Sequence, residues 1–322
     1  MTDKVLITQK IYDGAVALLD EAGLPYHYND SDETLAPEAL QELVAEATAL
    51  VCLLPNRIDT AVLDAASHLK IIANVAVGYD NIDVTAATER GIVVTNTPDV
   101  LTETTADLAF ALLLAIARRV VEADAYMRAG KYTRFELFPE MLGVDVYDKT
   151  LGIVGLGRIG TAVARRGALG FGMKVIYTAN NRKAAAEETL GVQRVTFPEL
   201  LAESDFISIN APLTPQTRHL FTLAEFRQMK PSAFIINTAR GPIIKEADLV
   251  EALAQGLIRG AALDVFEEEP LMHPGLAQFH DRLIVTPHIG SASVETRQNM
   301  SLLAMRNVLA VLSGKRPLSS VQ

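Results

Sequence analysis

The sequence predicts an α/β fold with two parallel sheets. In both halves of the chain, short apolar runs alternate with amphipathic stretches long enough to form helices. Strands that are separated by helices in this way form crossover units, which build parallel sheets. The 322 residues also exceed what one hydrophobic core usually organises, so we expect two domains.

The first alternating series occupies the N-terminal third of the chain. Its expected strands are 5–8, 49–54, 71–75 and 92–96, with helical stretches at 13–22 and 60–68. The series ends at a long helical stretch, 102–121, which is apolar nearly all round over 108–117. Because such a helix must be buried, we expect it to lie between domains or subunits.

The second alternating series starts at residue 151. Its expected strands are 151–154, 174–179, 206–210, 234–238, 260–265 and 283–286. Helical stretches are expected at 158–168, 247–255 and 294–312. We see no internal repeat, which excludes solenoids and propellers.

Composition excludes several classes of partner. With 39 acidic and 29 basic residues, the net charge of −10 argues against broad binding to nucleic acids or anionic membranes. The longest apolar run, 108–117, is roughly half of what spans a bilayer, and the first residues lack the apolar stretch of a signal peptide. The single cysteine, Cys52, cannot form an internal disulfide and is expected to be an inert core residue. We therefore expect a cytoplasmic protein.

A glycine-rich turn follows the first strand of the second series. Gly155, Gly157 and Gly160 form the pattern G-x-G-x-x-G between that strand and the next helical stretch. The first glycine permits a tight turn, the second lets the backbone approach a pyrophosphate, and the third lets helix and strand pack closely. The phosphates would then lie at the helix N-terminus. The motif therefore predicts dinucleotide binding, with a glycine-rich turn that binds no ligand as the alternative.

Four polar side chains lie at or just after the ends of three later strands of this series. They are Arg240, Asp264, Glu269 and His288. Because ligands of doubly wound sheets bind beyond the carboxyl ends of the strands, we expect these side chains to converge near the cofactor. Taken singly, each could instead be a surface turn residue or part of an exposed ion pair.

With these motifs, the chain resembles the D-isomer-specific 2-hydroxyacid dehydrogenases over essentially its whole length. The segments that carry the resemblance are VGYDNID (77–83), GLGRIG (155–160), NTARG (237–241), LDVFEEEP (263–270) and PHIG (287–290). Residues 101–110 and 148–154 are most similar to the glyoxylate/hydroxypyruvate reductase branch. The resemblance implies two doubly wound parallel-sheet domains, a Rossmann-like cofactor domain inserted into a flavodoxin-like substrate domain.

The expected domain boundaries follow from this architecture. The substrate domain would comprise 1–100 and 289–322, and the dinucleotide-binding and dimerisation domain 101–288, with hinges near Asp99 and His288. A cleft between them would close on the substrate and exclude water. The apolar helix and the prevalence of two-fold symmetry predict a homodimer, with burial of the helix inside one subunit as the alternative.

The resemblance implies a catalytic trio of Arg240, Glu269 and His288. Reduction of a 2-oxo acid needs a hydride from a nicotinamide, a proton for the developing alkoxide and a cation for the carboxylate. His288 suits the role of general acid, and Glu269 would hold its ring and favour the protonated form. Arg240 would bind the carboxylate and the 2-oxo oxygen. The backbone amides of Val77 and Gly78 would also bind the carboxylate, from the opposite side of the cleft, unless this segment is only a structural turn.

The resemblance also implies a set of cofactor contacts. Asp264 would orient the nicotinamide carboxamide, with a strand-end ion pair as the alternative. The expected cofactor contacts are Thr105, Gly155, Leu156, Gly157, Arg158, Ile159, Gly160, Asn180, Asn181, Arg182, Asn210, Ala211, Pro212, Thr217, Thr238, Ala239, Asp264 and Gly290. The remaining histidines have no mutual ligand spacing, so we expect no catalytic metal.

The adenosine end of this site departs from the pattern of NAD enzymes. Those enzymes place an acid about 20 residues beyond the glycines, and by alignment with the family that position is Ala179. Residues 149–186 contain no acid and seven bases. Arg182 could pair with a 2′-phosphate, and Asn180 or Asn181 could donate to it. We therefore predict that NADP(H) is preferred and NAD(H) possible, with a solvated basic loop and dual cofactor use as the alternative.

The expected function is NAD(P)H-dependent reduction of small 2-oxo acids, with glyoxylate and hydroxypyruvate foremost. Two alternatives stay open. One is reduction of a larger 2-keto acid such as 2-ketogluconate, and the other is a non-catalytic, nucleotide-sensing binding protein like a corepressor. Steady-state turnover distinguishes the enzyme from the binding protein.

Overall fold

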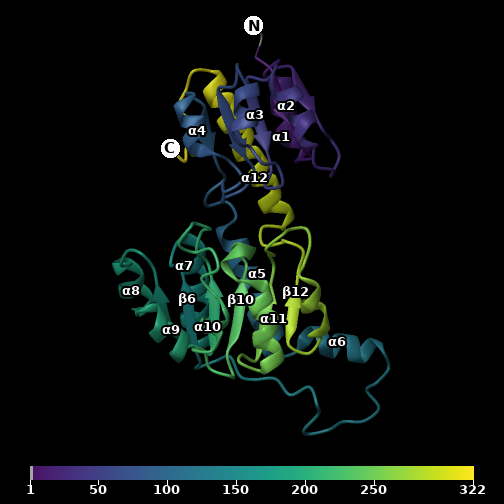
Figure 1. The fold of residues 1–322 in the computed structure, drawn as a ribbon, viewed down its shortest axis with the longest axis vertical. Coiled ribbons are helices and arrows are strands. Elements are labelled where there is room, and N and C mark those ends of the chain that lie inside the picture. Colours follow the sequence, from purple (N-terminus) through teal and green to yellow (C-terminus); the bar gives the residue numbers. More distant parts are fainter. Residues whose placement is uncertain (1–2) are drawn as a thin grey trace. The chain divides into compact units, whose positions relative to one another are not determined.

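The computed structural model describes residues 3–322 and divides the chain into two units, each with its own parallel sheet (Figure 1). Unit 1 combines Met1–Leu101 with Ser291–Gln322, and unit 2 is Thr102–Gly290. Every paired strand in both sheets runs parallel to its neighbour. The predicted α/β fold with two parallel sheets is therefore confirmed. Which unit binds substrate and which binds cofactor stays a prediction.

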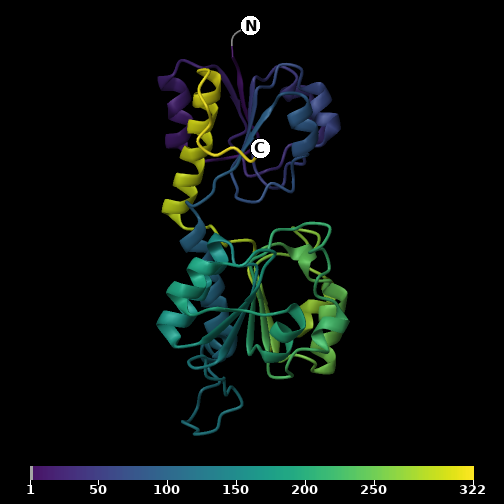
Figure 2. The ribbon, with the colours of Figure 1, turned by 90° about the vertical axis from the view of Figure 1, so that its left-hand side faces the viewer.

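Unit 1 has a five-stranded sheet in the order β2-β1-β3-β4-β5. The strands are β1 (Val5–Ile7), β2 (Tyr26–Tyr28), β3 (Ala49–Cys52), β4 (Ile71–Asn74) and β5 (Val93–Thr95). The helices are α1 (Asp13–Glu21), α2 (Pro37–Val44), α3 (Thr60–Ala65), α4 (Val84–Glu89) and α12 (Val294–Leu312). The helices α1 and α12 lie side by side on one face of the sheet (Figure 2), and α2, α3 and α4 share a hydrophobic cluster with the other face.

Unit 2 has a seven-stranded sheet in the order β12-β11-β10-β9-β6-β7-β8. The strands are β6 (Thr150–Val154), β7 (Lys174–Thr178), β8 (Gln193–Arg194), β9 (Phe206–Ile209), β10 (Phe234–Asn237), β11 (Gly260–Leu263) and β12 (Leu283–Val285). The α-helices are α5 (Thr102–Ala117), α6 (Val120–Arg128), α7 (Arg158–Arg165), α8 (Ala184–Leu190), α9 (Phe197–Glu203), α10 (Leu223–Phe226) and α11 (Glu246–Gln255), with a π-helical turn at Arg166–Gly170 and 3₁₀ turns at Gly241–Ile243 and Pro274–Gln278. The strand order reverses between β6 and β9, which is the topological switch point where such sheets bind ligands.

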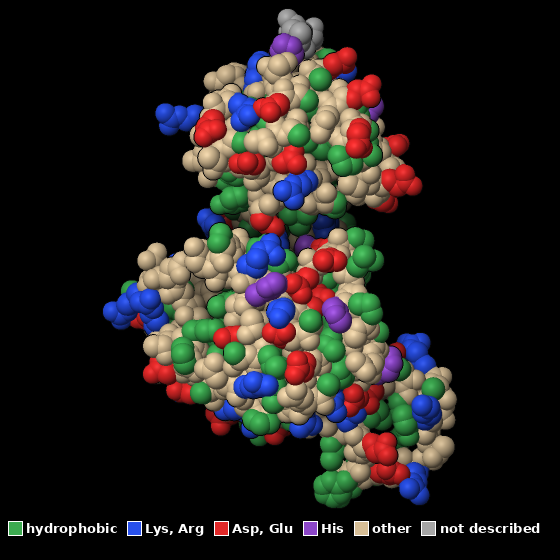
Figure 3. Space-filling model, in the orientation of Figure 1, with side chains coloured by type: hydrophobic (Ala, Val, Ile, Leu, Met, Phe, Trp, Pro, Cys, Tyr) green, Lys and Arg blue, Asp and Glu red, His purple; other side chains and the backbone are tan. Residues whose placement is uncertain are grey.

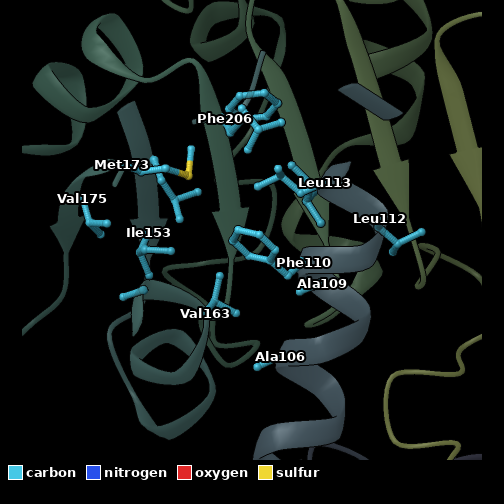
Figure 4. Close-up of a cluster of buried hydrophobic side chains, with 14 of the residues drawn as sticks. Ala106, Ala109, Phe110, Leu112, Leu113, Ile153, Val163, Met173, Val175 and Phe206 are labelled. Carbon is cyan, nitrogen blue, oxygen red and sulfur yellow. The ribbon is translucent and has the colours of Figure 1, made fainter. Parts of the chain in front are cut away.

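The long apolar helix expected over 102–121 is two helices. The helix α5 ends at Ala117 and α6 begins at Val120, because Arg119 adopts a left-handed backbone conformation with φ 53°. Side chains of α5, Phe110 and Leu113 among them, pack against β6, β9 and α7 inside unit 2 (Figure 4). The stretch 108–117 is therefore buried within one subunit, which was the alternative interpretation, and by itself it does not indicate a dimer.

Two further features bear on the sequence predictions. None of the helices within residues 3–322 is both long enough and apolar enough to cross a membrane. Cys52 is fully buried in β3, and this burial raises the pKa of its thiol to about 12. The cysteine is therefore unreactive, as expected for a core residue.

Candidate active site

The glycine-rich turn lies at the switch point of unit 2, between the carboxyl ends of β6 and β9. A side chain at Gly155 (φ 92°) would place its Cβ 2.8 Å from the backbone of Ala211, and one at Gly160 would overlap the carbonyl oxygen of Gly155. At Gly157, by contrast, an added Cβ would meet no atom within 4 Å. Gly157 is also the N-cap of α7 and offers no capping side chain to the first amides of the helix. Two glycines are thus required by packing and the third leaves open space at a helix N-terminus, so the turn fits a dinucleotide.

The structure brings His288 and Glu269 into direct contact. The distance between His288 Nδ1 and Glu269 Oε2 is 2.7 Å, and Glu269 Oε1 accepts a hydrogen bond from the Phe266 N–H at 3.1 Å. His288 follows β12 and adopts a left-handed backbone conformation with φ 53°. The bond from the Phe266 N–H fixes the Glu269 carboxylate to the segment after β11. The imidazole of His288 is therefore positioned by the segments that follow two neighbouring strands, β11 and β12.

The carboxyl of Glu269 is held in its ionised form. Burial raises its pKa, but the hydrogen bond and charge of His288, the Phe266 amide and the charge of Arg240 together outweigh burial, so the pKa lies below its ordinary value. An ionised Glu269 accepts the Nδ1–H hydrogen bond, which leaves Nε2 of His288 as the ring atom that can transfer a proton. The charge of Arg240 contributes to this lowered pKa, so Arg240 lies near the Glu269 carboxylate, and a joint catalytic role of the three residues stays a prediction.

Asp264 connects the segment that carries His288 to β11. Its carboxylate is fully buried. Oδ1 accepts from the Thr286 hydroxyl at 2.6 Å and the Ile289 N–H at 2.8 Å, and Oδ2 accepts from the Gly290 N–H at 2.7 Å. Burial raises the pKa of Asp264, and these donors partly offset that shift. The carboxylate thus accepts hydrogen bonds that hold the loop. Its expected contact with a nicotinamide stays a prediction.

The loop that carries Arg240 is held by an asparagine that sequence reasoning did not single out. Asn237, the last residue of β10, is buried and donates from Nδ2 to the Arg240 carbonyl at 2.9 Å, while its Oδ1 accepts from the Ala239 N–H at 3.0 Å. Arg240 itself donates from Nη1 to the Ala239 carbonyl at 2.9 Å. The signal in the sequence that could have identified Asn237 was a polar residue at the end of an apolar run.

The segment after β7, where the adenosine end of the cofactor is expected, contains an ion pair that the sequence interpretation missed. Arg182 donates from Nε to Glu187 Oε2 at 2.7 Å, and Glu187 Oε1 accepts from the Tyr177 hydroxyl at 2.7 Å. Both bonds lower the pKa of Glu187. Arg194 of β8 donates to the carbonyls of the preceding segment, those of Ala179 and Asn180. Glu187 lies one residue beyond the acid-free stretch, and Arg182 remains 70% exposed in this pair.

Several other expected cofactor contacts lie after the carboxyl ends of the unit 2 strands. Asn210 and Ala211 follow β9 and adjoin Gly155. Thr217 closes the next turn by donating from its hydroxyl to the Pro212 carbonyl at 2.7 Å. Thr105 of α5 adjoins Gly290. Leu156, Arg158 and Ile159 belong to the glycine-rich turn and the start of α7, Asn181 follows β7, and Thr238 and Ala239 follow β10.

A second histidine–glutamate pair lies in the same unit. His219 Nε2 is 2.6 Å from Glu267 Oε1. Glu267 and the buried Glu246 each accept the backbone N–H of the other at 2.7 Å, and the His219 N–H donates to the Pro242 carbonyl. These bonds link the loops that follow β9, β10 and β11. The sequence analysis left His219 without a role, because only the fold brings it next to Glu267.

Val77 and Gly78 lie in unit 1, in the turn after β4. Both are partly buried, and their carbonyls accept hydrogen bonds from Asn96 and Asn74 respectively.

Within residues 3–322 no group of three or more His, Cys, Asp or Glu side chains could hold a metal ion.

Comparisons with known proteins cover both units. Residues 110–290 match the family model described as D-isomer specific 2-hydroxyacid dehydrogenase, NAD binding domain. The glyoxylate reductase of Thermococcus onnurineus is 47% identical over 320 residues, which is 98% of this chain and 95% of that protein. A solved structure of a protein from Thermus thermophilus is 44% identical, with a TM-score of 0.91 over 99% of this chain and 100% of that chain. The NADPH-dependent glyoxylate/hydroxypyruvate reductase of Sinorhizobium meliloti, solved with NADP and malonate, is 33% identical, with a TM-score of 0.87 over 100% and 97% of the two chains.

Proposed function

Because this chain belongs to the D-isomer-specific 2-hydroxyacid dehydrogenases, in their glyoxylate reductase branch, we propose that it reduces glyoxylate and hydroxypyruvate with NADPH as the preferred reductant. The observation that carries this proposal is the 2.7 Å pair of His288 and Glu269. It lies in the same unit as a glycine-rich turn that fits a dinucleotide.

The proposed chemistry assigns one task to each residue. A bound nicotinamide cofactor supplies the hydride that reduces C2 of the 2-oxo acid. His288 donates the Nε2 proton to the carbonyl oxygen, which yields the hydroxyl group, and then regains a proton from water. Glu269 accepts the Nδ1–H bond and stabilises the charged ring before the transfer. Arg240 and the amides of Val77 and Gly78 are the proposed carboxylate ligands.

A panel of 2-oxo acids tests this proposal. Consumption of reduced cofactor would be measured with small, branched and sugar-derived 2-oxo acids, each with NADPH and with NADH. Highest kcat/KM for glyoxylate and hydroxypyruvate is the expected result. Highest kcat/KM for 2-ketogluconate would favour a reductase of larger acids, and no turnover with any acid would favour a nucleotide-sensing binding protein.

The proposed preference for NADPH rests on the segment after β7. Arg182 is the proposed ligand of the 2′-phosphate, and the S. meliloti relative is named as NADPH-dependent and was solved with NADP. Glu187 engages Arg182 through one carboxylate oxygen only, so the exposed side chain can also bind a phosphate. NAD(H) is expected to serve as the weaker cofactor.

Replacing Arg182 by alanine should raise the KM for NADPH by about tenfold, since a lost charge-assisted hydrogen bond has that order of effect. The KM for NADH should change little, and the affinity for 2′,5′-ADP should fall while that for 5′-AMP does not. Arg90→Ala is a matched control, because Arg90 is a surface arginine of unit 1 that pairs with Asp64 at 2.5 Å. Equal effects on both cofactors, or a wild-type kcat/KM that favours NADH, would contradict the assignment.

We further propose that the protein is a homodimer that associates through α6 and the segment after it. Many large apolar side chains are exposed there: Val120, Val121, Met127, Tyr132, Phe135, Leu137, Phe138, Leu142 and Tyr147. The segment extends away from the sheet of unit 2 (Figure 1), and apolar groups are visible along it in Figure 3. Exposed apolar surface of this extent is typical of an interface, and two-fold dimers are the commonest oligomers.

Light scattering tests the dimer directly. The expected particle has twice the 34.8 kDa mass of one chain. The double substitution Phe135→Asp and Phe138→Asp should dissociate it, because both rings are 79% exposed in the single chain and charges there cannot be buried in an interface. A wild-type particle of 34.8 kDa at micromolar concentration would refute the dimer.

A further inference from the structure

We propose that two asparagines, Asn74 and Asn96, position a row of three backbone amides that binds the substrate carboxylate. The row comprises the N–H groups of Val77, Gly78 and Tyr79. The inference rests on the proposed function, and it adds a third amide donor and two positioning side chains to the turn after β4.

The carbonyl groups of this turn are all bonded to donors at the ends of two neighbouring strands. Three successive carbonyl oxygens, those of residues 76–78, accept hydrogen bonds from the ends of β4 and β5. The three bonds run from the Thr97 N–H to the Ala76 carbonyl, from Asn96 Nδ2 to the Val77 carbonyl and from Asn74 Nδ2 to the Gly78 carbonyl, each 2.8 Å long.

This arrangement determines where the amides point. In a planar trans peptide the N–H of one residue points opposite to the carbonyl of the residue before it. With the carbonyls of 76–78 bonded to the ends of β4 and β5, the N–H groups of 77–79 point away from these strand ends. In the described part of the chain, none of these three amides donates to a protein acceptor. Successive amides that face one way form a concavity that binds anions, and a carboxylate is such an anion.

The donor side of the turn is rigid. Asn74 is fully buried, and its side chain is fixed by Asn81 and Cys52: Nδ2 also donates to Asn81 Oδ1 at 3.2 Å, and Oδ1 accepts from Cys52 Sγ at 3.6 Å. Asn81 in turn donates to the Asn56 carbonyl at 3.1 Å. Rotation of the Asn74 amide would therefore break several bonds at once.

Asn96 is held from the C-terminal segment. Its backbone carbonyl accepts from the Ser319 hydroxyl at 2.7 Å, and its N–H donates to the Ser319 carbonyl at 3.3 Å. Its side chain is thereby aimed at the Val77 carbonyl without help from the substrate. Donors that are fixed before the ligand arrives bind it at a lower cost in conformational entropy.

In unit 2, an asparagine at a strand end also holds the backbone of the loop that follows. Asn237 closes β10 and holds the Arg240 loop through one carbonyl and one amide, as Asn74 closes β4 and holds the Gly78 carbonyl. In both cases an asparagine at a strand end orients the backbone beside a proposed carboxylate ligand.

The test compares carboxylate binding with cofactor binding in an Asn96→Ala variant. We expect the KM for glyoxylate and the inhibition constant of oxamate, an unreactive analogue, to rise together by about tenfold, as for a weakened hydrogen bond to a charged group. The Kd for NADPH and the thermal midpoint should change little, which a general loss of structure would not allow. Asn29→Ala is the matched control, because Asn29 Nδ2 also donates to two carbonyls of unit 1, those of Thr8 and Glu33, away from this turn.

Unchanged KM and oxamate inhibition in a folded Asn96→Ala variant would overturn the inference, as would an equal loss of oxamate and NADPH affinity. A second measurement needs no variant. Addition of oxamate to the wild-type protein with NADPH should slow hydrogen exchange at the amides of 77–79, and unchanged exchange there would also overturn it. If oxamate slows this exchange but no 2-oxo acid is reduced, the proposed function fails and the amide row stands as a carboxylate site.

Discussion

Replacing His288 by alanine is expected to lower kcat for reduction of 2-oxo acids by about 10²–10⁴-fold, the usual range for a lost general acid. The imidazole is the group that carries a transferable proton on Nε2 while Glu269 occupies Nδ1 at 2.7 Å. Alanine removes the proton donor and leaves Glu269 without its hydrogen-bond partner. The KM for NADPH should change much less than kcat, because the glycine-rich turn is untouched.

Steady-state kinetics with saturating glyoxylate and NADPH measure this effect. His280→Asn is the control, since His280 is an exposed histidine of the same unit with no assigned role; its kcat should match the wild type. A His288→Ala enzyme with near-normal kcat would remove the assignment of His288 as the acid.

Replacing Arg240 by lysine should lower kcat/KM for 2-oxo acids on the order of 10²-fold, mainly through KM. The guanidinium offers paired, coplanar donors to a carboxylate and the adjacent oxygen, whereas an ammonium group is a single point charge. Asn237 holds the backbone of the loop through two hydrogen bonds that do not involve the Arg240 side chain, so the loop should keep its conformation in the variant.

Substrate saturation curves for the wild type, Arg240→Lys and Arg259→Lys test this prediction. Arg259 is an exposed arginine of unit 2, so its conversion to lysine should leave KM unchanged. An Arg240→Lys variant that keeps the wild-type KM and kcat would show that Arg240 does not bind the carboxylate.

Sequence patterns predicted the central strands because these strands are buried on both faces. The runs Ala49–Cys52 and Phe234–Asn237 are buried at every position, so they read as continuous apolar segments. Two of the four edge strands, β2 and β8, were missed for the opposite reason. Tyr26–Tyr28 is only partly buried and Gln193–Arg194 is exposed, so neither has an apolar pattern.

In the candidate site, the sequence also could not predict contacts that depend on the three-dimensional fold. The family resemblance predicted His288, Glu269 and Arg240 as the catalytic trio, and their residue types match the chemistry. It could not show that Glu187 pairs with Arg182, since that contact depends on where α8 begins. Apolar periodicity likewise predicted that 108–117 is buried but could not show that it is buried inside its own unit.

The most direct test of the central claim is product analysis with hydroxypyruvate and NADPH. The purified protein should consume NADPH and hydroxypyruvate in equal amounts and form glycerate of the D configuration, identified by chiral chromatography, and His288→Ala should form it far more slowly. Absence of hydroxypyruvate-dependent NADPH consumption, or formation of the L isomer, would contradict the account.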